Sequence, residues 1–190
     1  MNFKDSLSVT LILFSVIDIV GSIPFIILIR KREGRIYAER ATLISAILMI
    51  AFLFVGQSIL NLFGLDVSSF AVAGSIIMFI ISIEMILGIT LIKDDPEAKG
   101  TGSIVPLAFP LIAGAGTLTT ILSLRAVYNE LNILAGIVFN LVVIYIVLRA
   151  STWLETKIGK SGFAVLRRVF GVVLLSIAVK IFKSNFGTGD

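Results

Sequence analysis

The feature that most constrains this chain is a series of long apolar runs separated by short charged segments. These runs predict six membrane-spanning helices, because a helix needs about 20 residues to cross about 30 Å of hydrocarbon. None of the runs alternates as the strand of a membrane barrel does, so we predict an all-α membrane protein with 1–190 as a single transmembrane domain. The predicted spans are residues 7–29, 39–62, 68–92, 103–125, 131–149 and 163–183.

Two residue types that are common in catalytic and metal sites are missing from the chain. The chain has no cysteine and no histidine, which removes thiolate nucleophiles, imidazole bases and the usual zinc ligands. Only Asp18 and Glu84 place carboxylates inside the predicted spans, so we expect no metal, no cofactor and no enzyme. A lipid bound where both carboxylates meet would favour an enzyme instead. The basic residues lie between spans, so the net charge of +4 predicts no nucleic-acid partner.

The distribution of basic residues predicts an orientation. The loops after the first, third and fifth spans hold 12 of the 16 lysines and arginines, so the positive-inside rule assigns them to the cytoplasm. We therefore expect a multi-pass protein of the cell (inner) membrane with both termini on the extracytoplasmic side. The first residues lack the basic region of a signal peptide, and we expect the first span to be retained. The basic residues of these loops are Arg30, Lys31, Arg32, Arg35, Arg40, Lys93, Lys99, Arg149, Lys157, Lys160, Arg167 and Arg168.

Two of the six spans contain residues that interrupt helices. The fourth span carries Pro110, Gly114 and Gly116, and the first carries Gly21 and Pro24. Proline and glycine are the residue types that least support a helix interior, so we predict that both spans are broken. Backbone groups freed in hydrocarbon need a protein or water partner, which places such breaks among other helices or beside a cavity. Broken helices also offer backbone dipoles to a polar solute near the middle of the membrane.

The two halves of the chain resemble each other at an offset of about 95 residues. Gly21 in the first span corresponds to Gly116 in the fourth, and the repeats cover about 6–92 and about 103–186. The cytoplasmic linker between them is about 93–102. Because three spans are an odd number, the second repeat must enter the membrane from the opposite side. Inverted repeats are typical of transporters that alternate access around a central site, although coincidence among apolar helices remains the alternative.

Asp18 is the first candidate for a functional side chain. A carboxylate at this depth costs about 2.5–3.5 kcal/mol, so it should face the protein interior or water. It could bind a substrate ammonium group together with Gly21, or take a coupling proton or sodium ion. Alternatively, Asp18 caps the half-helix that follows the break by accepting hydrogen bonds from residues 20–22.

The fourth span supplies the complementary half of the candidate site. Gly114, Gly116 and Thr117 lie where a half-helix begins, and the dipole of its N-terminus would favour a carboxylate. A small zwitterionic solute would then fit between this positive terminus and Asp18. The alternative is that the two glycines form a notch for close helix packing.

Three further polar residues within the spans have two interpretations each. Glu84 is either a proton-relay carboxylate or the partner of a basic residue at the cytoplasmic end. Asn140 either contacts the substrate or joins helices by hydrogen bonds. Lys180 lies close enough to the end of its helix to reach the interface, which favours a structural role.

Four motifs resemble those of one family. Asp18-Ile-Val-Gly21-Ser-Ile-Pro24 resembles the Asp/Asn-Pro-x-Gly-x-x-Pro signature of MarC-family integral membrane proteins, and Pro110-Leu-Ile-Ala-Gly114-Ala-Gly116-Thr117 resembles the Pro-Leu-x-Ala-Gly-Pro-Gly signature. Ala73-Gly74-Ser75 and Arg168-Val-Phe-Gly171 are similar to the third and sixth helices of that family. Ile19 and Ala115 stand where the family has proline, so the breaks here would depend on the remaining glycines and prolines.

The resemblance implies a six-helix inner-membrane protein that is distantly like the lysine-exporter group. It further implies a transporter, in the outward direction, for small neutral amino acids such as glycine and alanine. No motif for binding nucleotides is present, so an ion gradient would drive transport. The alternatives are an exporter or channel for another small polar solute, or a membrane scaffold that does not transport. The expected partners are the zwitterionic solute, the coupling ion and the lipid bilayer, and the sequence leaves a homo-oligomer open.

Overall fold

The computed structural model describes residues 2–89 and 107–186, and this part of the chain contains helices and no strands. Three helices are long and apolar enough to cross a membrane, namely Ala38–Leu62, Val67–Leu87 and Glu130–Ser151. The predicted linker 93–102, with Lys93 and Lys99, lies outside the described residues. The helices are α1 (Phe3–Ile17), α2 (Ile23–Glu33), α3 (Ala38–Leu62), α4 (Val67–Leu87), η2 (Leu107–Ile112), α5 (Ala115–Leu124) and α6 (Glu130–Asn185).

Polar caps define where several of these helices begin. The Asn2 side chain accepts a hydrogen bond from the Lys4 amide at 3.2 Å, and the Asn129 side chain accepts one from the Leu131 amide at 2.9 Å. Asp66 caps α4 in the same way through the Ser69 amide at 2.9 Å. Hydrogen bonds from Ser69 hold the pKa of the Asp66 carboxyl below its usual value. Such caps satisfy backbone donors that have no partner within the helix.

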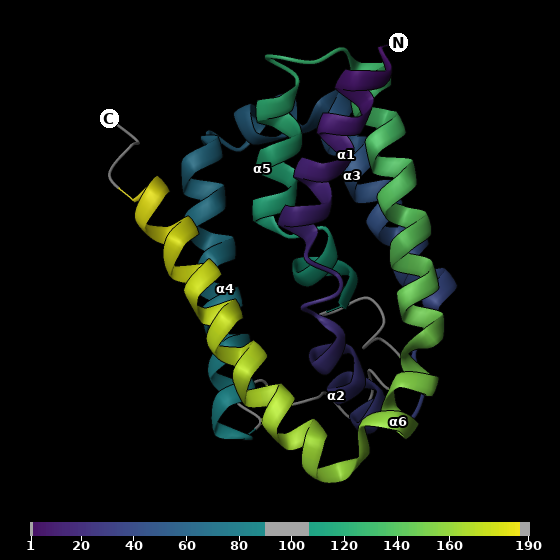
Figure 1. Ribbon diagram of the computed structural model, residues 1–190. Helices are drawn as coiled ribbons and strands as arrows, with labels where there is room; N and C mark the ends of the chain where they lie inside the picture. The colour runs from purple at the N-terminus through teal and green to yellow at the C-terminus, as the bar shows by residue number, and fades with distance from the viewer. Residues whose placement is uncertain (1, 90–106, 187–190) are drawn as a thin grey trace.

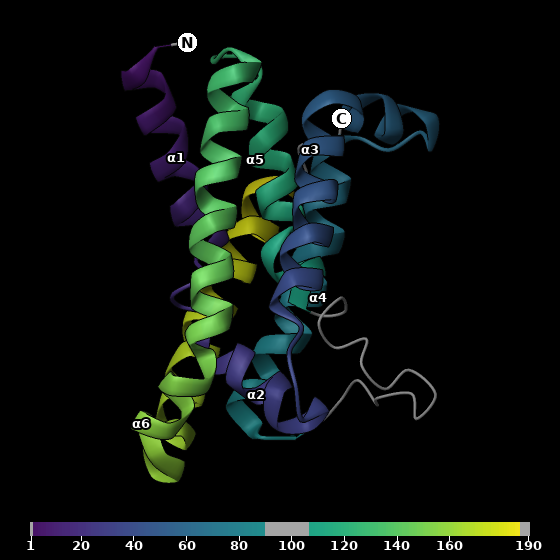
Figure 2. The ribbon, with the colours of Figure 1, turned by 90° about the vertical axis from the view of Figure 1, so that its right-hand side faces the viewer.

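The helix α6 contains both of the last two predicted spans. It has 56 residues, and the segment between the predicted spans 131–149 and 163–183 is itself helical. A straight helix of this length would be about 84 Å long. Figures 1 and 2 show instead that α6 bends sharply and doubles back, so its two arms run in opposite directions. The start of α1 and the end of α6 consequently lie toward the same end of the molecule (Figure 1).

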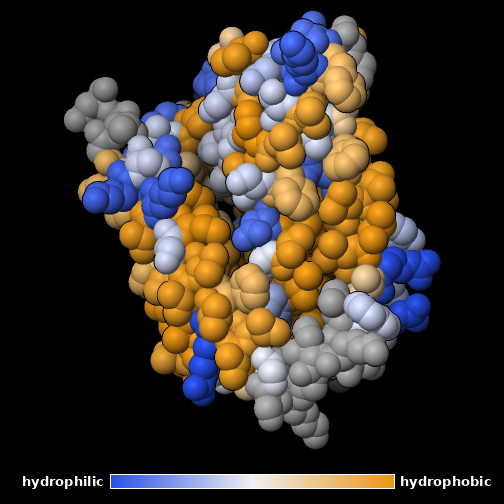
Figure 3. Space-filling view, viewed as in Figure 1, coloured by the Kyte–Doolittle hydropathy of each residue, from blue (hydrophilic) through white to orange (hydrophobic). Residues whose placement is uncertain are grey.

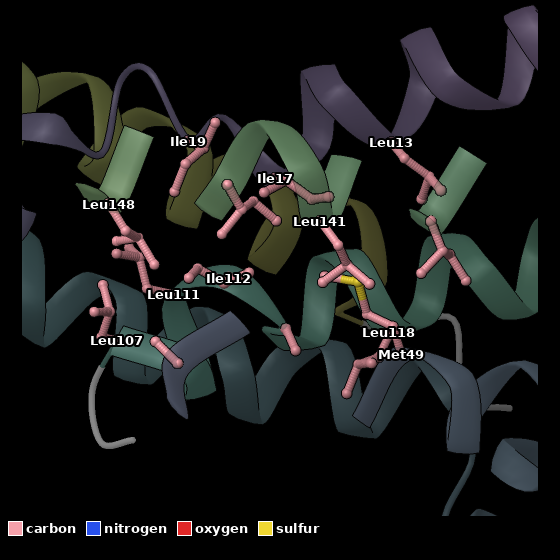
Figure 4. Close-up of a cluster of buried hydrophobic side chains, with 14 of the residues drawn as sticks. Leu13, Ile17, Ile19, Met49, Leu107, Leu111, Ile112, Leu118, Leu141 and Leu148 are labelled. Atoms are coloured by element: carbon pink, nitrogen blue, oxygen red, sulfur yellow. The ribbon is translucent and has the colours of Figure 1, made fainter. Parts of the chain in front are cut away.

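The core lies between the arms of α6 and the other helices. Helix α6 packs against α1, α2, α3 and α4, while α5 packs against α3, α4 and α1. Figure 4 shows the side chains of Ile17 and Ile19, next to the end of α1, pointing toward those of Ile112 and Leu141. Ile19 is 2% exposed, so the residue at the position of the family proline fills the core between the two broken segments.

Small residues allow the closest helix contacts. A Cβ on Gly74 of α4 would collide with the Cβ of Ala115 at the start of α5. A Cβ on Gly171 of α6 would lie 2.8 Å from Ile86 Cγ1, so the second arm of α6 also approaches α4 closely. Membrane helices associate largely through such packing, because lipid gives no hydrophobic drive for their contact.

Candidate functional site

The predicted break in the first span is present, and Asp18 is the first residue outside helix α1. Helix α1 ends at Ile17, and Asp18 adopts the left-handed conformation with φ 44° and ψ 49°. Asp is one of the few residue types besides glycine that visits this region. The Asp18 carbonyl accepts hydrogen bonds from the Ser22 amide at 3.0 Å and the Ser22 hydroxyl at 2.9 Å. The break therefore pairs part of its own backbone without help from another helix.

The carboxylate of Asp18 folds back over the same turn. Its Oδ1 accepts a hydrogen bond from the Gly21 amide at 3.1 Å, as the capping interpretation predicts. A Cβ on Gly21 would collide with Asp18 Oδ2, so only glycine leaves room for the carboxylate in this position. Pro24 lies in the first turn of α2, where the missing amide costs no helical hydrogen bond. This explains why α2 restarts immediately after the break.

The second broken segment has a different geometry. Phe109 is extended with φ −134° and ψ 132° inside η2, and Pro110 follows it. The Ala113 amide donates to the Ala108 carbonyl at 2.9 Å, a wider turn than that of an α-helix. Gly114 then precedes α5 in an extended conformation, and a Cβ there would collide with the Pro110 carbonyl. The chain thus leaves the helix at this point although Ala115 replaces a proline.

A cavity opens beside Asp18. Its walls come from the end of α1, the break, α2, α4, η2 and the second arm of α6, and Figure 3 shows a hollow on this face of the molecule. It offers about 30 Å³ to the centres of water molecules, which is room for about two of them, since each needs about 10–15 Å³. The lining residues are Val16, Ile17, Asp18, Gly21, Ser22, Phe25, Met78, Met85, Leu111, Phe170, Val173, Leu174 and Ile177.

The cavity has one charged group. Asp18 is half-buried and is the single ionisable residue in the lining, where the other side chains are apolar apart from that of Ser22. Within the described residues, Asp18 forms no ion pair. An anionic group surrounded by apolar walls favours a cationic partner, because an isolated charge in such a setting is costly.

The structure brings only part of the predicted site together. Asp18 and Gly21 line the cavity, whereas Gly114, Gly116 and Thr117 do not. Gly116 instead packs against α6, with Ile181 Cδ1 3.1 Å from the position of a Cβ, and Val16 Cγ1 lies 3.9 Å from that position. The Val16 side chain, which does line the cavity, therefore approaches the first turn of α5.

Two of the predicted polar ligands bond to backbone. The Thr117 hydroxyl donates to the Ile112 carbonyl at 3.0 Å across the second break. The Asn140 amide nitrogen donates to the Thr10 carbonyl at 3.1 Å and to the Gly136 carbonyl at 2.8 Å. Both residues are buried and both are absent from the cavity lining. Their contacts favour the structural alternatives: Thr117 pairs a freed carbonyl, and Asn140 joins α6 to α1.

Glu84 lies in the last turn of α4 and is absent from the cavity lining. It is 2% exposed, and its carbonyl accepts the Gly88 amide that closes α4. The Arg167 Nη2 occupies the space where a side chain on Gly88 would begin. Gly88 is the left-handed cap that ends α4, so this contact places the Arg167 guanidinium at the C-terminal end of the helix, next to its last turn with Glu84. A basic side chain at this end of α4 agrees with the interpretation of Glu84 as the partner of a basic residue, which stays a prediction.

The apolar walls of the cavity were missed by sequence reasoning. Met78 and Met85 are seven residues apart on α4, and Phe170, Leu174 and Ile177 form one stripe on α6. That spacing shows a shared helix face. It does not separate a cavity wall from a core or lipid-facing stripe, because all three are apolar in a membrane protein.

Sequence comparison identifies the family. Residues 3–186 match a family described as "MarC family integral membrane protein". The chain belongs to the MarC family. The two signatures noted in the sequence thus mark the two breaks in the fold of this MarC-family protein, at residues 18–22 and 109–114. The chain is an integral membrane protein built from apolar helices.

Relatives match over nearly their whole length. A UPF0056 membrane protein of Buchnera aphidicola is 29% identical over 182 residues, and the match covers 93% of each chain. One of Pyrococcus abyssi is 28% identical, with 92% of each chain covered. The Bacillus subtilis membrane protein YvbG is 27% identical, covering 94% of this chain and 92% of its own. No solved structure matches the chain.

Proposed function

We propose that this MarC-family protein is a secondary transporter that exports small neutral amino acids such as glycine and alanine, driven by an ion gradient. The observation that carries the proposal is the Asp18 carboxylate, which lies at a helix break beside a cavity in an otherwise apolar lining. Intramembrane carboxylates are expensive and are typical of substrate and ion pathways.

The hydrogen bonds of Asp18 leave room for a ligand. The carboxylate accepts one backbone hydrogen bond, from Gly21, whereas two carboxylate oxygens offer about four acceptor sites. An ammonium group, a proton or a sodium ion would each compensate the remaining charge. A substrate ammonium and a coupling ion that compete for one carboxylate provide a simple physical route to coupled transport.

The dimensions of the cavity support a small solute. Room for about two water molecules fits a conformation in which the site is nearly closed. Met78 and Met85 form part of the wall, and methionine side chains adapt their shape easily. Glycine or alanine would require a modest widening, whereas a large side chain would require the second arm of α6 to move.

The arrangement of helices supports two inverted repeats. In this proposal α1, α2, α3 and α4 form the first repeat, and η2, α5 and the two arms of α6 form the second. Each repeat begins with a broken segment followed by two long helical segments. We further propose an inner-membrane location with both termini extracytoplasmic. Two repeats related in this way would move against each other to expose the cavity alternately to each side.

Counterflow in proteoliposomes tests the proposal. Vesicles preloaded with unlabelled glycine, alanine or serine should accumulate the same labelled compound, and a pH or sodium gradient should change the rate. Asp18→Asn should lower exchange by about tenfold to a hundredfold, because a hydrogen bond to a charged group contributes about 1.5–3 kcal/mol. The gradient should no longer affect the residual exchange.

A matched variant separates the role of Asp18 from general loss of charge. Asp66→Asn removes an exposed carboxylate at the N-cap of α4, outside the cavity lining, and should exchange at the wild-type rate. Normal exchange by folded Asp18→Asn would remove Asp18 from the mechanism. If folded wild-type protein exchanges none of these amino acids, this substrate class is wrong.

A further inference from the structure

The cavity provides a partner for only one of the two charges of an amino acid. Its lining contains Asp18 and no basic residue. The carboxylate of a zwitterion would therefore lie among apolar side chains unless a cation approaches from outside the lining. Leaving that charge without a partner would cost more than the ammonium contact gains.

The two half-helix N-termini do not meet this need in the described conformation. The Gly21 amide at the start of the α2 segment already donates to Asp18. The first turn of α5 is separated from the cavity by Val16, and none of its residues belongs to the lining. A full positive charge must come from a side chain elsewhere.

Lys180 is placed to supply it. It follows Val173 and Ile177 by seven and three residues on α6, so it lies at the Val173 edge of the helix face that lines the cavity. A helical side chain covers the turn that precedes its own Cα, which directs Lys180 back toward Ile177. Lys180 is exposed, and it forms no ion pair within the described part of the chain.

The neighbouring residue fixes the level of Lys180 in the molecule. Ile181 Cδ1 lies 3.1 Å from the position of a Cβ on Gly116, in the first turn of α5. The same position is approached by Val16, which lines the cavity two residues before Asp18. Because Ile181 is its neighbour on α6, Lys180 lies at the level of the first turn of α5 and of Val16, close to the two helix breaks.

We propose that Lys180 binds the carboxylate of the zwitterionic solute whose ammonium group is held by Asp18. This inference rests on the proposed function and adds a residue that selects amino acids over simple amines. The flexible four-carbon stem of lysine allows its ammonium to follow the solute as the cavity opens. Asp18 then recognises the class of ammonium compounds, and Lys180 restricts that class to those carrying a carboxylate.

Lys183 provides a matched control three residues further along α6. It is equally exposed, but it lies one turn beyond Val179, which lines a separate apolar groove between α4 and α6. Lys183 has the same side chain as Lys180 and lies on the same helix, but it projects from a different face of α6. Lys183→Ala should therefore reproduce any general effect of removing a lysine from this end of α6.

The test compares alanine with alaninamide, which keeps the ammonium group and lacks the carboxylate. Competition by each compound against labelled alanine is measured in proteoliposomes for wild type, Lys180→Ala, Lys180→Arg and Lys183→Ala. Lys180→Ala should reduce the preference for alanine over alaninamide by about tenfold, as expected for a charge-assisted hydrogen bond. Lys180→Arg should restore most of the preference, and Lys183→Ala should retain it.

The outcomes separate this inference from the proposed function. If wild type exchanges alanine and Lys180→Ala keeps the wild-type preference, the role of Lys180 is wrong and the transporter assignment stands. An equal loss of preference in Lys183→Ala would also overturn it, because the effect would be a general one of surface charge. If folded wild type exchanges no amino acid, both proposals fail together.

Discussion

Asp18 and Gly21 act as a pair at the scale of single residues. The left-handed turn at Asp18 points its carboxylate back to the Gly21 amide, and the missing side chain of Gly21 provides the space that the carboxylate fills. The orientation of the charged group toward the cavity therefore depends on a residue that carries no chemistry of its own.

Gly21→Ala should impair transport to about the same extent as Asp18→Asn. The new methyl group would collide with Asp18 Oδ2, so the carboxylate would have to leave its position. Exchange in proteoliposomes should fall about tenfold or more, as for the loss of a charged hydrogen bond. Val20→Ala is the control, because it shortens a half-exposed side chain in the same turn. Wild-type exchange by Gly21→Ala would contradict the proposed packing.

The same two residues show what sequence reasoning can find. A carboxylate within an apolar run is conspicuous, and a glycine three residues later fits a break. Thr117 and Asn140 are equally polar in the sequence, yet their hydrogen bonds go to backbone carbonyls. Residue type alone does not distinguish a side chain that binds a solute from one that satisfies the backbone, because both need the same donor.

The contact between α1 and α6 is the clearest example at the scale of helices. A Cβ on Gly136 would lie 2.7 Å from Val9 Cγ1, so the two helices approach closely there. One turn further, Asn140 donates to the Thr10 carbonyl. Close approach and an interhelical hydrogen bond reinforce each other, because the first brings the donor within reach of the second helix.

Asn140→Ala should weaken the protein without changing its selectivity. Interhelical hydrogen bonds in membranes contribute about 0.6 kcal/mol on average and up to about 1.7 kcal/mol. The apparent unfolding midpoint in detergent should fall, while the KM for the transported amino acid stays at the wild-type value. Asn61→Ala, which removes an exposed amide at the end of α3, should leave the midpoint unchanged. A raised KM with normal stability would return Asn140 to the binding site.

The helix α6 shows where prediction from the sequence falls short at this scale. Charged residues between 149 and 168 separate two apolar stretches in the sequence, but the chain stays helical between them. Charge indicates contact with water or headgroups and says nothing about the backbone, since lysine, arginine and glutamate are good helix formers. By contrast, the breaks at Gly21 and Gly114 were predictable because proline and glycine act on the backbone directly.

At the scale of the whole molecule, the long apolar helices followed from run length, whereas the cavity did not. Its walls combine α1, α2, α4, η2 and α6, which are brought together only by the bend of α6 and the two breaks. No local pattern in the sequence predicts that these helices pack around one cavity. The cavity therefore depends on the arrangement of all these segments, and the side of the membrane to which it opens depends on the orientation of the chain.

That orientation can be measured directly because the chain has no cysteine. Single cysteines at Ser184, near the end of α6, and at Glu39, in the first turn of α3, would each be the only thiol in the protein, and both positions are exposed. The basic loops predict that Ser184→Cys faces outward and Glu39→Cys faces the cytoplasm. A membrane-impermeant maleimide should label Ser184→Cys in intact spheroplasts and Glu39→Cys only after lysis. A cytoplasmic protein with an accessible thiol serves as the control for membrane integrity. If it is labelled before lysis, the spheroplasts are leaky and the labelling of both variants carries no information on orientation. The reverse pattern in sealed spheroplasts would invert the predicted orientation, and the end of α6 that carries Lys180 would then lie on the cytoplasmic side of the membrane.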